Sequence, residues 1–157
     1  MIPILLAMAA VAAPQSDRLP PAKPLPMAVD GEEGAVMRSV SALLRAIERG
    51  DGPALLATVN ADGAATVVAD GRSPKTMRWV DLASGLKADN SRAEERLGTP
   101  AIEFDGDVAM VWAPYTFLVN GAVHHCGYDH FDLVRQAGSW KVLNVTWSQR
   151  TTGCAAP

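Results

Sequence analysis

The chain has 157 residues, of which 48% are hydrophobic and 20% are charged, and its formal net charge is -3. This length and composition are ordinary for one globular domain with its own core, and they exclude intrinsic disorder over most of the chain. Because no run of Lys or Arg occurs, the basic surface that nucleic-acid or anionic-membrane binding requires is not expected.

An apolar run opens the chain, and a proline-rich stretch follows it. Residues 1–13 read MIPILLAMAAVAA, which is far short of the ~20 residues that span a bilayer, and they end in small residues that signal peptidase accepts. The prolines between Pro14 and Pro26 disfavour helix and sheet there. We therefore expect a signal peptide at 1–13, a linker at 14–29 and one domain at 30–154, in a protein exported to the periplasm or secreted. Because residues 1–13 contain no Lys or Arg, a buried N-terminal helix is the alternative.

The first half of this domain predicts helices. Asp30 and Glu33 have the spacing of a capping box, apolar residues recur at helical intervals from Val36 to Ile47, and Gly50 is a typical helix stop. Residues 87–99 are polar and predict a loop followed by the start of a strand. Shorter elements are expected between these segments: a helix at 51–59 capped by Asp51, a strand at 65–69, an extended segment at 76–80 and a helix at 81–87.

The second half predicts a sheet, because its apolar residues change to strand spacing. Runs rich in Val, Phe, Tyr, Trp and Thr occupy 100–104, 108–119, 123–135 and 140–149. Asp105-Gly106 and Asn120-Gly121 separate the first three, and such dipeptides are strong hairpin signals because both turn residues need positive φ. Helices followed by an antiparallel meander indicate an α+β domain.

The order of these elements resembles the nuclear transport factor 2-like superfamily. The likeness is carried by RAIERGDGPALLATV at 45–59 and by the meander at 105–154, in which HCGYDHFDLVR at 125–135 is the most specific stretch. It is greatest to exported bacterial members described as SnoaL-like or lumazine-binding-like. The resemblance implies N-terminal helices packed on a strongly curved antiparallel sheet, in a cone that encloses a pocket and is often dimeric. Its members include isomerases, dehydratases, cyclases and non-catalytic binders, so no single activity follows.

A two-residue turn at Asn120-Gly121 would set the register of the hairpin. Thr116 would then pair with His125, and Trp112 with Asp129. The face that these residues share combines apolar groups with a few polar ones, which suits a pocket for a small hydrophobic or aromatic ligand. The candidates on it are His125 and Asp129 for catalysis, and Met110, Trp112, Thr116, Phe131, Asn144 and Thr146 for ligand binding.

His125 and Asp129 are the candidates for proton transfer. A carboxylate in a semi-apolar pocket can have its pKa raised and act as a general base, and a nearby imidazole can relay the proton. Gly127 between them would leave room for a ligand at the backbone. Four strand residues span ~13 Å, so no direct hydrogen bond between the two side chains is expected. The alternative is structural, with a buried Asp129 held by Trp112 and Asn144.

The sequence gives little support to metal or thiol chemistry. His124 and Cys126 point to the opposite face from His125, which leaves too few ligands for zinc. A disulfide from Cys126 to Cys154 is favoured over a catalytic thiol if the compartment is oxidising. No cofactor is expected.

The other face of the hairpin would carry Tyr115, Phe117, Tyr128 and Trp147. This is too much apolar surface to be fully solvated, so a helix or a partner must cover it, and we expect a homodimer. Two functions are therefore considered. One is a small-molecule pocket with isomerase-, dehydratase- or cyclase-type acid–base chemistry, and the other is a non-catalytic dimeric binding or interaction module of the cell envelope.

Overall fold

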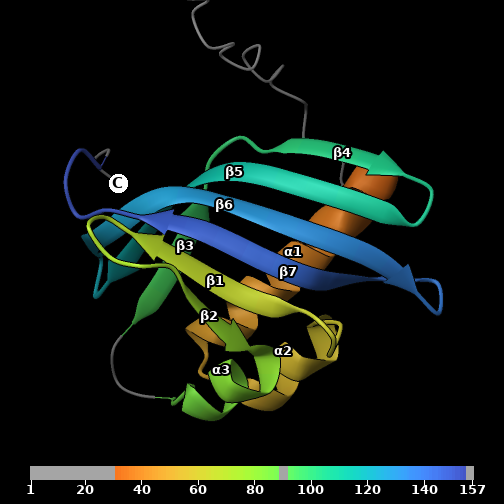
Figure 1. The fold of residues 1–157 in the computed structure, drawn as a ribbon, viewed down its shortest axis with the longest axis horizontal. Helices are drawn as coiled ribbons and strands as arrows, with labels where there is room; N and C mark the ends of the chain where they lie inside the picture. The colour runs from red at the N-terminus through yellow and green to blue at the C-terminus, as the bar shows by residue number, and fades with distance from the viewer. Residues whose placement is uncertain (1–30, 89–91, 155–157) are drawn as a thin grey trace, which may run out of the picture.

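The computed structural model of the protein describes residues 31–88 and 92–154. The predicted signal peptide and linker at 1–29 lie outside the described residues. Figure 1 shows helix α1 (Glu32–Glu48) running behind the strands of a curved sheet, with α2 (Gly52–Thr58) and α3 (Trp79–Gly85) at one side. None of the described helices is long and apolar enough to cross a membrane.

The helices form where the apolar spacing predicted them. The predicted stripe of α1 is buried, with Val36, Val40 and Leu43 fully inaccessible to solvent. Gly31 and not Asp30 is the N-cap of α1, and within the described residues no side chain caps this end; Asp30 itself lies outside the described residues. The second cap is confirmed, since the backbone N–H of Ala54 donates to Asp51 Oδ1 at 2.9 Å.

One seven-stranded sheet follows the order β2-β1-β7-β6-β5-β3, and β4 also pairs with β5. All pairs are antiparallel except β1 with β7, so the sheet is mixed, whereas a wholly antiparallel sheet was predicted. The long strands match their predicted ranges to within one residue at each end. The bounds are β1 Ala64–Ala69, β2 Lys75–Arg78, β3 Ala93–Leu97, β4 Ala101–Asp105, β5 Val108–Val119, β6 Ala122–Gln136 and β7 Ser139–Gln149.

The predicted register of the β5–β6 hairpin is correct only next to the turn. The first pairs after Asn120-Gly121 form as expected, but the ladder then shifts between Phe117 and Leu118. His125 therefore pairs with Phe117 and not with Thr116. His124 is the extra residue of a β-bulge, and a shift of one residue exchanges the faces of one strand relative to its neighbour.

The bulge decides which side chains of β5 face the helices. Ala109, Val111, Ala113 and Tyr115 are buried, whereas Trp112 is 38% exposed. The inner face of the sheet is thus built from the β5 residues that were assigned to the outer one. The core lies between this face and the helices, and it includes Trp79, whose indole N–H donates to the Leu143 carbonyl at 2.9 Å.

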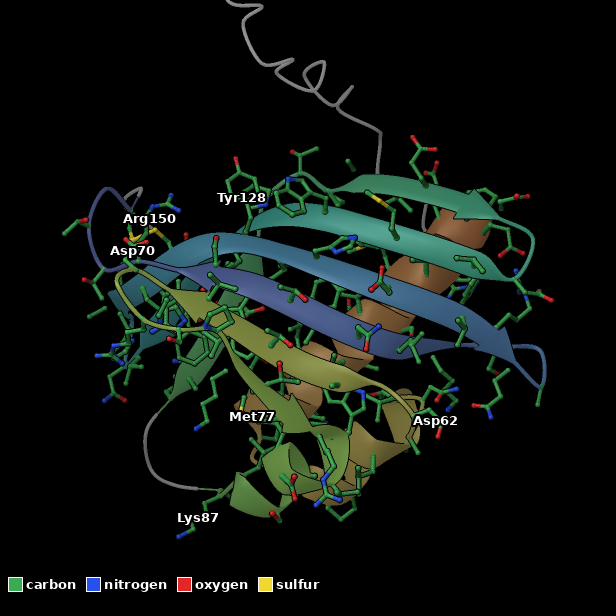
Figure 2. All side chains as sticks on the ribbon, viewed as in Figure 1. Asp62, Asp70, Met77, Lys87, Tyr128 and Arg150 are labelled. Atoms are coloured by element: carbon green, nitrogen blue, oxygen red, sulfur yellow. A yellow bond between two sulfur atoms is a disulfide. The ribbon has the colours of Figure 1, made fainter. Side chains whose placement is uncertain are left out.

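A disulfide fixes the C-terminal segment to the outer side of the sheet. Cys126 on β6 is bonded to Cys154, which is the pairing favoured from the sequence. The backbones of Cys126 and Arg150 also exchange two hydrogen bonds of 3.0 Å. Figure 2 shows Arg150 beside this disulfide, at the end of the sheet.

Candidate functional site

A cavity of about 180 Å³ lies between the inner face of the sheet and helices α1 and α3. Aliphatic side chains of the two helices form one wall, and aromatic and polar side chains of the strands form the other. Most of the surface is apolar, with few polar groups, as is common in small-molecule sites. The lining residues are Leu43, Leu44, Ile47, Leu82, Glu95, Phe117, His125, Asp129, Phe131, Val145, Trp147 and Gln149.

Two carboxyl groups meet on the strand wall of this cavity. Asp129 on β6 is only 3% exposed, and it hydrogen-bonds to the carboxyl of Glu95 on β3. Its Oδ2 atom is fully enclosed, and no donor among the described residues reaches it. Glu95 is held from behind, because its backbone N–H donates to Glu48 Oε1 at 3.1 Å. Buried carboxyls that lack a cation are costly when ionised.

The pKa values of both carboxyls respond to this environment. Burial raises the pKa of Asp129 to about 9, and the neighbouring Glu95 adds to the effect. Burial likewise raises the pKa of Glu95 to about 7, the charge of Glu48 contributes, and the hydrogen bond with Asp129 opposes the rise. Two interacting acids titrate as a pair, so between about pH 7 and about pH 9 they share one proton and carry about one negative charge.

His125 closes the same wall as a neutral ring. Its imidazole stacks on Phe117 with ring centroids 4.7 Å apart, and its Nδ1 lies 2.8 Å from Nδ1 of His124. Burial lowers the pKa of His125 to about 4, and the nearby His124 acts in the same direction. At neutral pH the ring is therefore uncharged, and its Nε2 atom, which hydrogen-bonds to no other described residue, can bond to a ligand.

Gly127 lies between His125 and Asp129 for a reason that differs from the predicted one. A Cβ here would overlap the carbonyl oxygen of Ser148 on the neighbouring strand, so glycine permits the close approach of β7 and not of a ligand. Tyr115 is the register partner of Gly127, and its hydroxyl donates to the same Ser148 carbonyl at 2.9 Å. The two polar positions thus lie on a stretch of β6 that approaches β7 closely.

The structure divides the predicted site residues into two groups. His125, Asp129 and Phe131 line the cavity, as expected. The other five do not line it. Trp112 pairs with His130 rather than Asp129, and stacks on Tyr128 with centroids 5.3 Å apart. Figure 2 shows Tyr128 projecting from the sheet away from the helices. The residues outside the cavity are Met110, Trp112, Thr116, Asn144 and Thr146.

Asn144 and Asp129 do not meet, so the structural alternative, in which Trp112 and Asn144 hold Asp129, names the wrong neighbours. The Asn144 side chain accepts a hydrogen bond from the Ala64 backbone N–H at 3.1 Å and lies 3.4 Å from Asp132. Glu95 takes the place beside Asp129 instead.

Sequence reasoning missed Glu95 because 87–99 is mostly polar. The alternation of Ala93, Glu95 and Leu97 in β3 was the available signal for a strand there.

The predicted dimer surface does not exist as a single face. Phe117 and Trp147 line the cavity, and Tyr115 is 3% exposed, whereas Tyr128 is 39% exposed. The helices of the same chain therefore cover most of the apolar surface that had been assigned to a partner.

Within residues 31–88 and 92–154, no three His, Cys, Asp or Glu residues are grouped as a metal site.

Comparisons with known proteins give similarity in fold alone. No family model and no curated protein matches the sequence. A nuclear transport factor 2-like protein from Cytophaga hutchinsonii aligns with a TM-score of 0.66 at 13% identity, over 77% of this chain and 100% of that one. A nuclear transport factor 2-like protein with a cystatin-like fold from Novosphingobium aromaticivorans gives 0.62 at 18% identity, over 79% and 85%. A protein from Catenulispora acidiphila in complex with S-DNPA gives 0.61 at 16% identity, over 74% and 92%. The chain therefore has the nuclear transport factor 2-like α+β fold that its sequence predicted.

Proposed function

We propose that the protein binds a small, largely apolar molecule in this cavity and exchanges protons with it through Glu95 and Asp129. The observation that carries the proposal is the carboxyl of Asp129, which is 3% exposed and has an enclosed oxygen without a donor. Leaving such a group unsatisfied costs about 1–3 kcal/mol. A ligand that hydrogen-bonds to the carboxyl pair gives a physical reason for the arrangement.

The two carboxyls suit opposite halves of a proton transfer. Glu95, with a pKa raised to about 7, can take a proton from a carbon atom next to a carbonyl group. Asp129, with a pKa raised to about 9, can give its proton to the carbonyl oxygen as the enol forms. The number of protons on the pair is then unchanged, and return of a proton to another carbon completes an isomerisation. His125 would orient the ligand as a neutral hydrogen-bonding group.

A simple carbon acid tests this chemistry without knowledge of the natural substrate. Phenylacetone matches the cavity of about 180 Å³ in size, since an apolar cavity of ~150 Å³ holds benzene. In D2O we expect the protein to accelerate exchange of its α-hydrogens, followed by proton NMR. Asp129→Asn and Glu95→Gln should each abolish the acceleration, while His130→Gln, on the opposite face of β6, should not. Bound phenylacetone that exchanges no faster than in buffer would refute the catalytic part of the proposal.

Export to an oxidising compartment is part of the proposal. The Cys126–Cys154 disulfide supports it, because such bonds persist mainly outside the cytosol. Mass spectrometry of protein recovered from its native host should find cleavage near Ala12 or Ala13. A soluble protein with an intact N-terminus would contradict this part.

The alternative is a non-catalytic module that pairs with a second copy through the outer face of the sheet. It is favoured by the stacked pair of Trp112 and Tyr128, which are 38% and 39% exposed. Exposed aromatic groups of this kind are enriched at interfaces. Analytical ultracentrifugation of the protein and of a Tyr128→Lys variant decides it, since a native monomer would exclude the homodimer.

A further inference from the structure

The charged side chains that line the cavity are acidic. Its lining residues include Glu95 and Asp129 but neither Lys nor Arg, and Glu48 lies directly behind Glu95. The one basic side chain of the lining, His125, is stacked against Phe117 in an apolar setting that disfavours its charged form. Negative charge enclosed without a cation is unfavourable, so a positively charged ligand is the natural complement of this wall.

The second feature is the kind of hydrogen-bonding group that is missing. Asp129 Oδ2 is enclosed and lacks a donor among the described residues. The carboxyl pair that lines the cavity therefore offers acceptor oxygens, and a ligand must bring an N–H or O–H group to it. The remaining walls are aliphatic and aromatic, and the faces of Phe117, Phe131 and Trp147 attract cations as well as apolar groups.

We propose that the cavity binds a small organic amine in its protonated form, with the ammonium group donating to the carboxyl pair of Asp129 and Glu95 and the apolar body lying against Phe117 and Trp147. The inference rests on the proposed function in that it uses the same cavity, and it names the chemical class of the ligand. A cavity of about 180 Å³ limits the ligand to roughly the size of one aromatic ring with a short side chain.

The state of the carboxyl favours this class energetically. Asp129 is already removed from water in the free protein, so the free-energy cost of its desolvation is part of folding. On binding, only the ammonium group loses water. A charge-assisted hydrogen bond contributes about 1.5–3 kcal/mol. We therefore expect an amine to bind at least about tenfold more tightly than a neutral molecule of the same shape.

Affinity should also depend on pH with a defined sign. Protons compete with the ammonium group for the carboxyl pair, and the pair loses its first proton as pH rises past the raised pKa of Glu95, about 7. Benzylamine should therefore bind more tightly at about pH 8 than at about pH 6, while benzyl alcohol should change little.

The test compares benzylamine, benzyl alcohol and benzoate by calorimetry or by ligand-observed NMR. The full protein should bind benzylamine at least about tenfold more tightly than either of the others. Asp129→Asn should reduce this preference to within about twofold. Asp132→Asn, three residues along the same strand and half-buried outside the cavity, should preserve it. Glu94→Gln, beside Glu95 in β3, is the matching control for Glu95→Gln.

Each remaining outcome overturns the inference. Equal or tighter binding of benzyl alcohol or benzoate, no binding of benzylamine, or a preference that survives in Asp129→Asn would each contradict it. Phenylacetone exchange separates this failure from that of the proposed function. If the exchange is catalysed and benzylamine does not bind, the ligand class is wrong and the acid–base site stands. If benzylamine binds selectively and no exchange occurs, the ligand class stands and the proposed acid–base chemistry is wrong.

Discussion

Replacing Asp129 with Asn should make the protein more stable at alkaline pH, although it removes a buried polar partner. Burial, with Glu95, raises the pKa of Asp129 from 3.8 to about 9. At pH values between these two the unfolded chain is ionised at this position while the folded chain holds the proton. The unfolded state then binds fewer protons, so stability conferred by the wild-type residue is present below pH 3.8 and is lost as pH rises towards 9.

The magnitude follows from the size of this shift. Each pH unit between the two pKa values corresponds to about 1.4 kcal/mol, so near pH 8 the cost is on the order of 6 kcal/mol. Part of it belongs to the pair and remains with Glu95. An Asn side chain has nearly the same shape, carries no titrating proton and can donate to Glu95 through its amide. We therefore expect Asp129→Asn to raise the free energy of unfolding by about 2 kcal/mol near pH 8.

Urea unfolding followed by tryptophan fluorescence, with the disulfide kept oxidised, measures this difference. The stabilisation by Asp129→Asn should shrink to within about 1 kcal/mol near pH 4.5, because this pH lies less than one unit above the ordinary aspartate pKa of 3.8. Asp132→Asn, outside the cavity, should show no such pH-dependent gain. A variant less stable than wild type at pH 8, or a difference that is independent of pH, would refute the assignment of Asp129 as a buried neutral acid.

Three further changes test other parts of the site. In the wild type, His125 has a pKa lowered to about 4, so its contribution to stability is present above pH 6.5 and is lost as pH falls to 4. His125→Gln should therefore flatten the dependence of stability on pH between these values. An unchanged profile would contradict this prediction. Gly127→Ala should destabilise the protein by about 3 kcal/mol or more in denaturant unfolding, because its Cβ would overlap the Ser148 carbonyl, whereas Gly121→Ala, with open space around it, should cost less. Cys154→Ser should remove about 3 kcal/mol, since the Cys126–Cys154 disulfide closes a loop with a separation of 28 residues; an equally stable variant would show that the bond does not constrain the unfolded chain.

The elements of this fold are predictable because local signals agree with the final structure. Asp51 caps α2, Asn120 and Gly121 both adopt positive φ, and the apolar stripe of α1 is buried. The parallel pairing of β1 with β7 has no such signal. It depends on how distant strands meet, and alternation within each strand is the same for either direction.

The candidate site was predictable only in the part that a single strand defines. Alternation along β6 places His125, Asp129 and Phe131 on one face whatever strand lies beside them, and that face was assigned correctly. Glu95 reaches Asp129 through the pairing of β3 with β5, in which Glu95 lies opposite Phe117. This pairing spans a polar segment and a long sequence separation, so the carboxyl pair could not be deduced from either strand alone.

The position of the cavity follows from the bulge at His124. In a regular ladder Trp112 would be the partner of Asp129 and would project to the same side of the sheet, into the space beside the carboxyl. The shift instead pairs Asp129 with Ala113, whose methyl group leaves that space open, and it turns the indole of Trp112 to the outer face. The same shift sets Phe117 against His125, and the pairing of β3 with β5 places Phe117 opposite Glu95. One extra residue in β6 therefore both empties the inner face near Asp129 and assembles the aromatic and acidic groups around it.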